Sequence, residues 1–217
     1  MQKGHPNYKV VLAAIAVVLV FEFFSVIVLN EMVYHRLLLV LGFIRIVEIL
    51  FLAAIIAAWG GGLESIGLTR SSIAIGVRKG LIWSAGFGVC ALLLLGVLFV
   101  FDYNLLHIFQ SPVQGSALGF ISLLVVGGLI SPIAEEIFFR GILYGYLRKW
   151  GVIFAVIGST ALFAMAHLLT LGVTPVQIIG GLVFAIAYEI EKNLLVPIII
   201  HVLGNLALFT LSTLLVS

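Results

Sequence analysis

Long apolar runs are the feature of this sequence that most limits its fold. A helix of about 20 apolar residues spans the hydrocarbon core of a bilayer, which is about 30 Å thick. The chain contains several such runs, hydrophobic residues make up 63% of its 217 residues, and only 9% are charged. In lipid, only helices and closed barrels satisfy their backbone hydrogen bonds, and these runs lack the alternation of barrel strands. The sequence therefore predicts an all-α polytopic membrane protein.

The runs predict a bundle of about seven transmembrane helices. An eighth is left open because the fourth run is long and the sixth is short. The predicted spans are 9–30, 37–58, 80–101, 116–147, 152–170, 175–190 and 194–215. With no internal repeat and no second domain in the pattern, residues 1–217 are predicted to form one integral-membrane domain.

Three residues bear on the shape of the fourth run. Pro132 is expected to kink or restart the helix, because proline removes a backbone hydrogen bond. Gly141 and Gly145 lie four positions apart on one helical face. Small residues at this spacing predict the close approach of a neighbouring helix.

Basic residues are distributed unevenly between the predicted loops. With a cytoplasmic N-terminus, Arg36 is the one basic loop residue outside, as the positive-inside rule favours. The basic residues then on the cytoplasmic side are Lys3, Lys9, Arg70, Arg78, Lys79, Arg148, Lys149 and Lys192. We therefore predict a cytoplasmic N-terminus and a solvated cytoplasmic loop 59–79. The net charge of +2 is too small to indicate a nucleic-acid partner.

The stretch SPIAEEIFFRGILYG, residues 131–145, places three charges in a strongly apolar run. A charged side chain at the centre of a bilayer costs about 2.5–3.5 kcal/mol on insertion scales, so each one calls for a reason. Glu136 and Arg140 are four apart and share a helical face, which predicts that they pair. Glu135 lies about 140° around the helix from Arg140 and is expected to face another group.

Two later apolar segments supply ionisable partners for Glu135. His167 follows Phe163 by four positions, and Asn205 follows His201 by four, so each pair shares a helical face. A carboxylate beside imidazoles can take a proton from water or hold Zn²⁺, and an amide can donate to a developing oxyanion. The simpler interpretation is that the histidines are packing residues and the charges of 131–145 form a structural ion pair.

The remaining intramembrane charges favour structural roles. Arg45 and Glu48 are three apart on the second predicted helix and are expected to neutralise each other. Glu22 has no partner nearby in the sequence. It is expected either to face a water-filled cavity or to be protonated.

Together these residues resemble the motifs of the CPBP family of intramembrane proteases. This family includes CAAX proteases and bacteriocin-processing proteins and is also called Abi. The motifs are Glu-Glu-x-x-x-Arg at 135–140, Phe-x-x-x-His at 163–167 and His-x-x-x-Asn at 201–205, each on a separate predicted helix. Each motif is weak alone, but three in order on hydrophobic helices are specific. The resemblance extends over residues 116–210, which are the expected catalytic core.

The resemblance implies an intramembrane (metallo)endopeptidase. Glu135 would activate the water with His167 as its partner, while His201 and Asn205 would stabilise the tetrahedral intermediate. The supporting residues would be Glu136, Arg140 and Phe163. His167 and His201 would be the ligands of a bound zinc ion. A metal-free glutamate mechanism remains equally open.

The expected partners are the lipid bilayer and a peptide or protein substrate at the membrane. The chain shows no targeting signal, which favours a prokaryotic plasma membrane. The alternative function is a non-catalytic membrane scaffold, immunity protein or transporter subunit that uses the polar cluster for binding or proton relay. Against a transporter, the sequence shows no inverted repeat.

Overall fold

The computed structural model describes residues 6–31, 34–101, 117–168 and 175–216. All regular secondary structure in these ranges is helical, which confirms the predicted all-α fold. Each of the seven predicted spans corresponds to one helical rod. Six of these rods contain the helices α1 (Tyr8–Glu31), α2 (Tyr34–Trp59), α3 (Ile73–Val100), α7 (Val152–Leu168), α8 (Pro175–Glu191) and α9 (Leu195–Val216).

The remaining rod, called the catalytic rod below because it carries Glu135, which the resemblance predicts to be catalytic, changes its helical type along its length. It consists of α4 (Ala117–Val125), the π-helical η4 (Val126–Ile130), α5 (Ser131–Glu136), the π-helical η5 (Ile137–Tyr144), α6 (Gly145–Leu147) and the closing 3₁₀ turn η6 (Arg148–Trp150). The prediction that the helix restarts at Pro132 agrees with the structure, because α5 begins at Ser131 with the proline in its first positions. Ser131 keeps helical dihedral angles (φ −61°, ψ −46°), and the chain passes the proline through a π-turn.

Five described segments are long and apolar enough to cross a membrane. They are Tyr8–Val28, Leu37–Trp59, Leu63–Leu98, Ala117–Trp150 and Leu195–Thr213. The apolar helix Val152–His167 is shorter. The third helix begins at Ile73, earlier than the predicted 80, so the basic residues Arg78 and Lys79 lie within its first turns.

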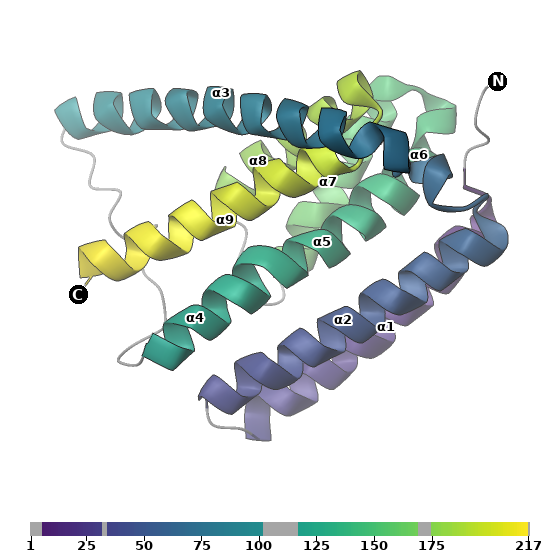
Figure 1. Ribbon diagram of the computed structural model, residues 1–217, viewed down its shortest axis with the longest axis horizontal. Coiled ribbons are helices and arrows are strands. Elements are labelled where there is room, and N and C mark those ends of the chain that lie inside the picture. Colours follow the sequence, from purple (N-terminus) through teal and green to yellow (C-terminus); the bar gives the residue numbers. More distant parts are fainter. Residues whose placement is uncertain (1–5, 32–33, 102–116, 169–174, 217) are drawn as a thin grey trace.

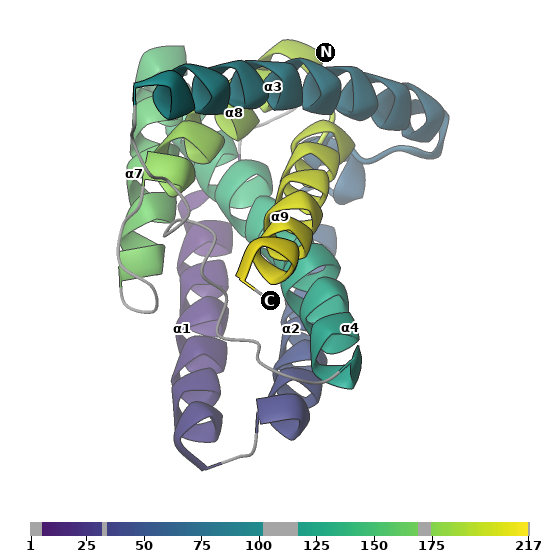
Figure 2. The same ribbon diagram turned by 90° about the vertical axis from the view of Figure 1, so that its left-hand side faces the viewer.

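The catalytic rod lies between the N-terminal hairpin and the C-terminal helix (Figure 1). The antiparallel helices α1 and α2 form the hairpin, and α2 packs along α4, η4 and α5. On the other side α9 contacts η4 and α5, while α7 and α8 pack together beside η5. Figure 2 shows α3 crossing the bundle at one end, where it contacts α9 and α8. This arrangement brings the three sequence motifs to the middle of the bundle.

The loop between α2 and α3 takes part in the core, so the prediction that residues 59–79 form a solvated loop is only partly correct. Ile66, in the 3₁₀ turn η1 (Leu63–Ile66), is 1% exposed, and its carbonyl accepts a hydrogen bond from Tyr188 Oη at 3.2 Å. Ile66 also occupies the space opened by Gly141, where an added Cβ would lie 3.3 Å from Ile66 Cγ2. Pro6 lies similarly close to Gly145. The two glycines therefore admit a loop and the N-terminal segment, and not the neighbouring helix that we predicted.

Ionic contacts gather basic residues of separate segments at one end of the bundle. Lys79 lies 3.4 Å from Glu191, and Glu189 pairs with both Arg148 and Lys192. These three basic residues belong to the set predicted to be cytoplasmic, so their common position agrees with a single polar face. The side of the membrane that this face occupies stays a prediction.

Candidate active site

Glu136 and Arg140 form a fully buried ion pair within the catalytic rod. Arg140 Nη1 donates to Glu136 Oε1 at 3.0 Å, and both side chains are 0% exposed. Arg140 Nη2 donates to the Gly181 carbonyl of α8 at 3.2 Å. The predicted pairing is present because a spacing of four residues places both side chains on one face, even where the helix widens into η5. The pair also joins the rod to α8.

Aromatic rings surround the Arg140 guanidinium. Its central carbon lies 4.6 Å from the ring centre of Phe163 and 5.3 Å from that of Phe184, both within the range of cation–π attraction. Phe163 thus contacts the supporting arginine, whereas the contributions of Phe184 and Gly181 were not predicted. The Gly180–Gly181 pair in α8 is the sequence signal that could have indicated a close approach here, because a Cβ at Gly181 would lie 3.0 Å from Thr160.

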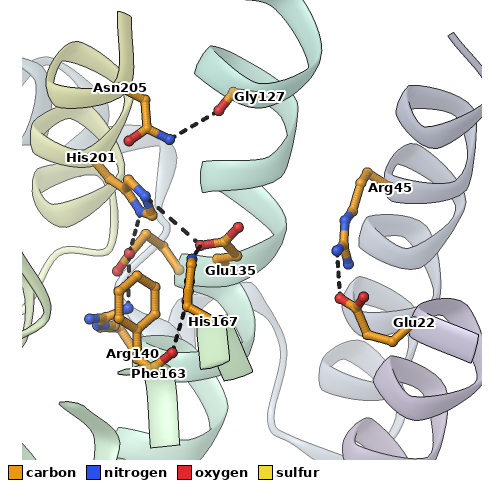
Figure 3. A network of polar contacts seen from close by, with 10 residues as sticks. Glu22, Arg45, Gly127, Glu135, Arg140, Phe163, His167, His201 and Asn205 are labelled. Carbon is orange, nitrogen blue, oxygen red and sulfur yellow. Dashed lines mark hydrogen bonds and ion pairs between the residues drawn. The ribbon is translucent and has the colours of Figure 1, made fainter. Parts of the chain in front are cut away.

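Glu135 faces away from this pair and toward two histidines from different helices (Figure 3). Its Oε2 lies 3.8 Å from His167 Nε2 of α7 and 3.8 Å from His201 Nε2 of α9. Both separations are too long for direct hydrogen bonds. Oε2 is buried and has no hydrogen-bond partner among the described residues. The Glu135 and His167 side chains are each 20% exposed, so the site is not completely closed.

The second nitrogen of each imidazole indicates which tautomer is present. His167 Nδ1 lies 2.9 Å from the Phe163 carbonyl, and His201 Nδ1 lies 2.8 Å from Glu136 Oε1. Both neighbours are acceptors, so each Nδ1 carries the proton, and in a neutral imidazole the lone pair is then on Nε2. Three acceptor atoms therefore converge, namely two Nε2 atoms and Glu135 Oε2. A buried carboxylate oxygen needs a donor or a cation, and a water molecule can donate to such groups.

The residues around Glu135 do not form a zinc site as they are placed. Two imidazoles and a carboxylate are suitable zinc ligands, but ligands about 2.1 Å from a tetrahedral ion lie about 3.4 Å apart. The two separations of 3.8 Å are longer, and within the described part of the chain no group of three His, Cys, Asp or Glu is arranged to hold a metal ion. We therefore derive no step through a metal, and zinc bound by His167 and His201 stays a prediction.

Asn205 lies one turn beyond His201 on α9 and points to a different target. Its Nδ2 donates to the Gly127 carbonyl in η4 at 3.0 Å (Figure 3). The structure thus brings Glu135, His167 and His201 together, while the Asn205 amide contacts the backbone of the catalytic rod.

A second ionic network lies on α1 and α2. Arg45 Nη1 donates to Glu48 Oε2 at 2.6 Å, which is the predicted pair. Arg45 Nη2 pairs with Glu22 of α1, so the interpretation of Glu22 as unpaired is wrong. Sequence spacing could not show this contact, because the two residues are 23 positions apart on different helices. Glu48 is close enough to Glu135 for the two carboxylates to interact electrostatically.

Comparison with known proteins shows a similarity over the part of the chain that carries these motifs. Residues 117–207 match the family described as Type II CAAX prenyl endopeptidase Rce1-like. The resemblance to the CPBP intramembrane proteases is confirmed. The matched segment contains all three CPBP motifs and Gly127. Its apolar helices and this relationship together identify the chain as an integral membrane protein.

A second similarity, to a single protein, supports the resemblance to the CPBP proteases. The membrane-embedded CAAX protease MroQ of Staphylococcus aureus (strain USA300) is 38% identical over 84 residues, which are 36% of this chain and 34% of that protein. The alignment therefore spans about a third of the relative's length. No solved structure matches this chain.

Proposed function

We propose that this protein is an intramembrane endopeptidase, which hydrolyses a peptide bond in a membrane-associated or lipid-modified substrate with a water activated by Glu135. The observation that carries this proposal is the convergence of Glu135 Oε2 with the Nε2 atoms of His167 and His201, each 3.8 Å away. A water between these atoms can donate to the carboxylate oxygen that lacks a partner. The match to a family of endopeptidases supports the same conclusion.

Glu135 acts as the general base in the proposed reaction. It takes one proton from the water while the water oxygen bonds to the carbonyl carbon of the substrate. The carbonyl oxygen becomes an oxyanion. The proton then passes to the peptide nitrogen, with His167 as the neighbouring acceptor and donor, and the carbon–nitrogen bond breaks to release an amine and a carboxylic acid. The acid then loses its remaining proton to the amine or the solvent. No net proton is gained or lost by the protein.

His201 acts as an electrophilic donor backed by Glu136. The Glu136 carboxylate accepts from His201 Nδ1 at 2.8 Å and so fixes the orientation of the imidazole ring. Once Glu135 has passed the proton it took from the water to His201 Nε2, the ring donates from Nε2 to the oxyanion, where a charge-assisted hydrogen bond is stronger than a neutral one. The same proton then returns through Glu135 and His167 to the peptide nitrogen. Arg140 balances the buried Glu136 charge and holds it in place.

Purified protein and a set of membrane-anchored test peptides can test this activity. We expect cleavage of at least one peptide by the wild type and none by Glu135→Gln. The matched control is Glu64→Gln, which removes an exposed acid of the loop between α2 and α3 and should cleave like the wild type. If Glu135→Gln cleaves normally, the base is assigned wrongly. If the wild type cleaves no peptide while its polar cluster binds protons or a partner, the non-catalytic scaffold or transporter function is favoured.

The zinc prediction has its own measurement. If His167 and His201 hold zinc, the purified protein contains close to one Zn²⁺ per chain, and chelation stops cleavage. Full cleavage after thorough metal removal would support the metal-free glutamate mechanism.

We further propose a prokaryotic plasma membrane with the N-terminus in the cytoplasm. The positions of Lys79, Arg148 and Lys192 at one end of the bundle support a single cytoplasmic face. Reporter fusions should place the N-terminus and the loop 59–79 inside the cell, and the C-terminus outside. A cytoplasmic C-terminus would overturn a topology of seven crossings.

A further inference from the structure

Pro132 leaves a backbone carbonyl of the catalytic rod without its helical donor. In η4 the Ser131 N–H donates to the Val126 carbonyl, five residues earlier. In the same pattern the next donor would be residue 132, and its acceptor would be the Gly127 carbonyl. Proline has no N–H, so this hydrogen bond cannot form. An unsatisfied carbonyl in a membrane-spanning segment is costly and calls for another donor.

Asn205 supplies that donor from a different helix. Its Nδ2 lies 3.0 Å from the Gly127 oxygen. The surrounding contacts show that α9 is closely fitted to η4. A Cβ on Gly128 would lie 2.6 Å from Leu206 Cδ2, and one on Gly127 would lie 3.1 Å from Phe209 Cε2. The two glycines thus let α9 approach closely enough for the short asparagine side chain to reach the backbone.

We propose that Asn205 is a positioning residue, which fixes α9 to the catalytic rod by bonding the carbonyl that Pro132 leaves unpaired. This inference rests on the proposed function where it concerns catalysis. His201 and Asn205 lie one turn apart on α9 and contact the rod at two separate points, Glu136 and Gly127. These two polar contacts add to the apolar packing of α9 against η4 and α5. Two contacts set the register of α9 and therefore the separation of His201 from Glu135.

This role differs from that of an oxyanion donor in its dependence on Pro132. Replacing Pro132 by alanine returns an N–H to position 132, where the helix can supply the Gly127 carbonyl itself. If Asn205 acts through this carbonyl, Pro132→Ala makes its amide partly redundant. If Asn205 acts on the substrate, its importance does not depend on residue 132.

The first experiment measures thermal stability in detergent with Glu135→Gln as the common background, so that it needs no substrate. We expect Asn205→Ala to lower the midpoint by about 2–4 °C, and Pro132→Ala to remove most of that loss. The matched control is Thr213→Ala, whose hydroxyl donates to the Phe209 carbonyl within α9. Its effect should be the same with either residue at position 132. Equal losses from Asn205→Ala in both backgrounds would overturn the inference.

A second comparison leaves Pro132 unchanged. Asn205→Leu has a similar size but no donor, whereas Asn205→Gln keeps the amide. We expect glutamine to retain more of the thermal stability than leucine. A leucine variant as stable as the parent would contradict a role for the Gly127 hydrogen bond.

The third measurement uses the peptide that the wild type cleaves. Misplacement of His201 should lower kcat about 10- to 100-fold in Asn205→Ala, with KM changed by less than about twofold. Pro132→Ala should restore part of kcat. A stability coupling without any cleavage by the wild type would preserve the inference about α9 and refute the proposed function. Cleavage by the wild type without the stability coupling between Asn205 and Pro132 would refute the inference about α9 and leave the proposed function intact.

Discussion

The two ionic networks of this protein have similar composition and different organisation. In the catalytic rod, the fully buried Arg140 neutralises Glu136 alone, and the adjacent Glu135 faces two histidines. On the N-terminal hairpin, Arg45 binds a carboxylate with each terminal nitrogen, Glu22 on one and Glu48 on the other. The hairpin network therefore uses both acids as partners of one cation, whereas the rod keeps one acid for the histidines.

This difference teaches how a membrane interior can hold both structural and reactive charges. A charge that is paired at short distance has little capacity for chemistry, because its lone pairs or protons are already used. A carboxylate oxygen with no hydrogen-bond partner can accept a proton from water. Among the described residues, Glu135 Oε2 and Glu136 Oε2 are both buried without a hydrogen-bond partner. Of these two oxygens, Glu135 Oε2 is the one that faces the Nε2 atoms of His167 and His201.

The largest expected effect comes from removing the acid that faces the histidines. Glu135→Gln should lower turnover about 100- to 10,000-fold, the usual contribution of general acid–base catalysis. Its thermal stability should stay close to that of the wild type, since the ion pairs of Glu135 with His167 and His201 among the described residues are both as long as 3.8 Å. Rate measurements and thermal unfolding of the same preparation test both statements. A large loss of stability would show that Glu135 is structural.

The second largest expected effect is a loss of folding stability in Arg140→Ala. Arg140→Ala leaves Glu136 in a fully buried site with no cation, at a cost of about 3–5 kcal/mol. Denaturation in mixed micelles should show this destabilisation directly. The double variant Arg140→Ala/Glu136→Gln should recover much of the lost stability, because the uncompensated charge is gone. An Arg140→Ala protein as stable as the wild type would contradict the pairing.

A smaller loss is expected in the hairpin network. Arg45→Ala should cost about 1–3 kcal/mol, because it leaves Glu48, whose side chain is 3% exposed, without its hydrogen-bond donor. Cleavage per folded molecule should change less than in any variant of Glu135. If Arg45→Ala abolishes cleavage without destabilising the protein, the hairpin network takes part in the reaction and the contrast between the two networks fails.

The smallest effect should come from Glu22→Gln. The Glu22 side chain is 40% exposed, and a glutamine at this position keeps an oxygen that can accept from Arg45, so the loss should be at most about 1 kcal/mol. Unfolding in mixed micelles should place this variant within that range of the wild type, whereas Glu48→Gln, at 3% exposed, should cost more. If Glu22→Gln lost more stability than Glu48→Gln, Glu22 would be the more strongly stabilising acid of this network.

Several features of the site could be predicted because they depend on one helix alone. The pairs Glu136–Arg140 and Arg45–Glu48 are close in sequence, and their spacing on a helix brings their side chains together. The assignment of the three motifs to the CPBP family also came from residues at short spacing. The pairing of Glu22 with Arg45, the burial of Ile66 and the two π-helical segments could not be predicted in this way. Apolar composition is the same in α- and π-helices, and no local spacing shows which residue of another segment will fill a space.

The sequence by itself determined the membrane-spanning helices, the pairing of charges within a helix and the motifs of the family. The tertiary structure alone decided that Glu135 lies between His167 and His201, and that Asn205 bonds the Gly127 carbonyl. The physical reason is that helical periodicity fixes which side chains share a face of one helix. The rotation and spacing of different helices depend instead on how their surfaces pack, here through Gly127 and Gly128 against α9.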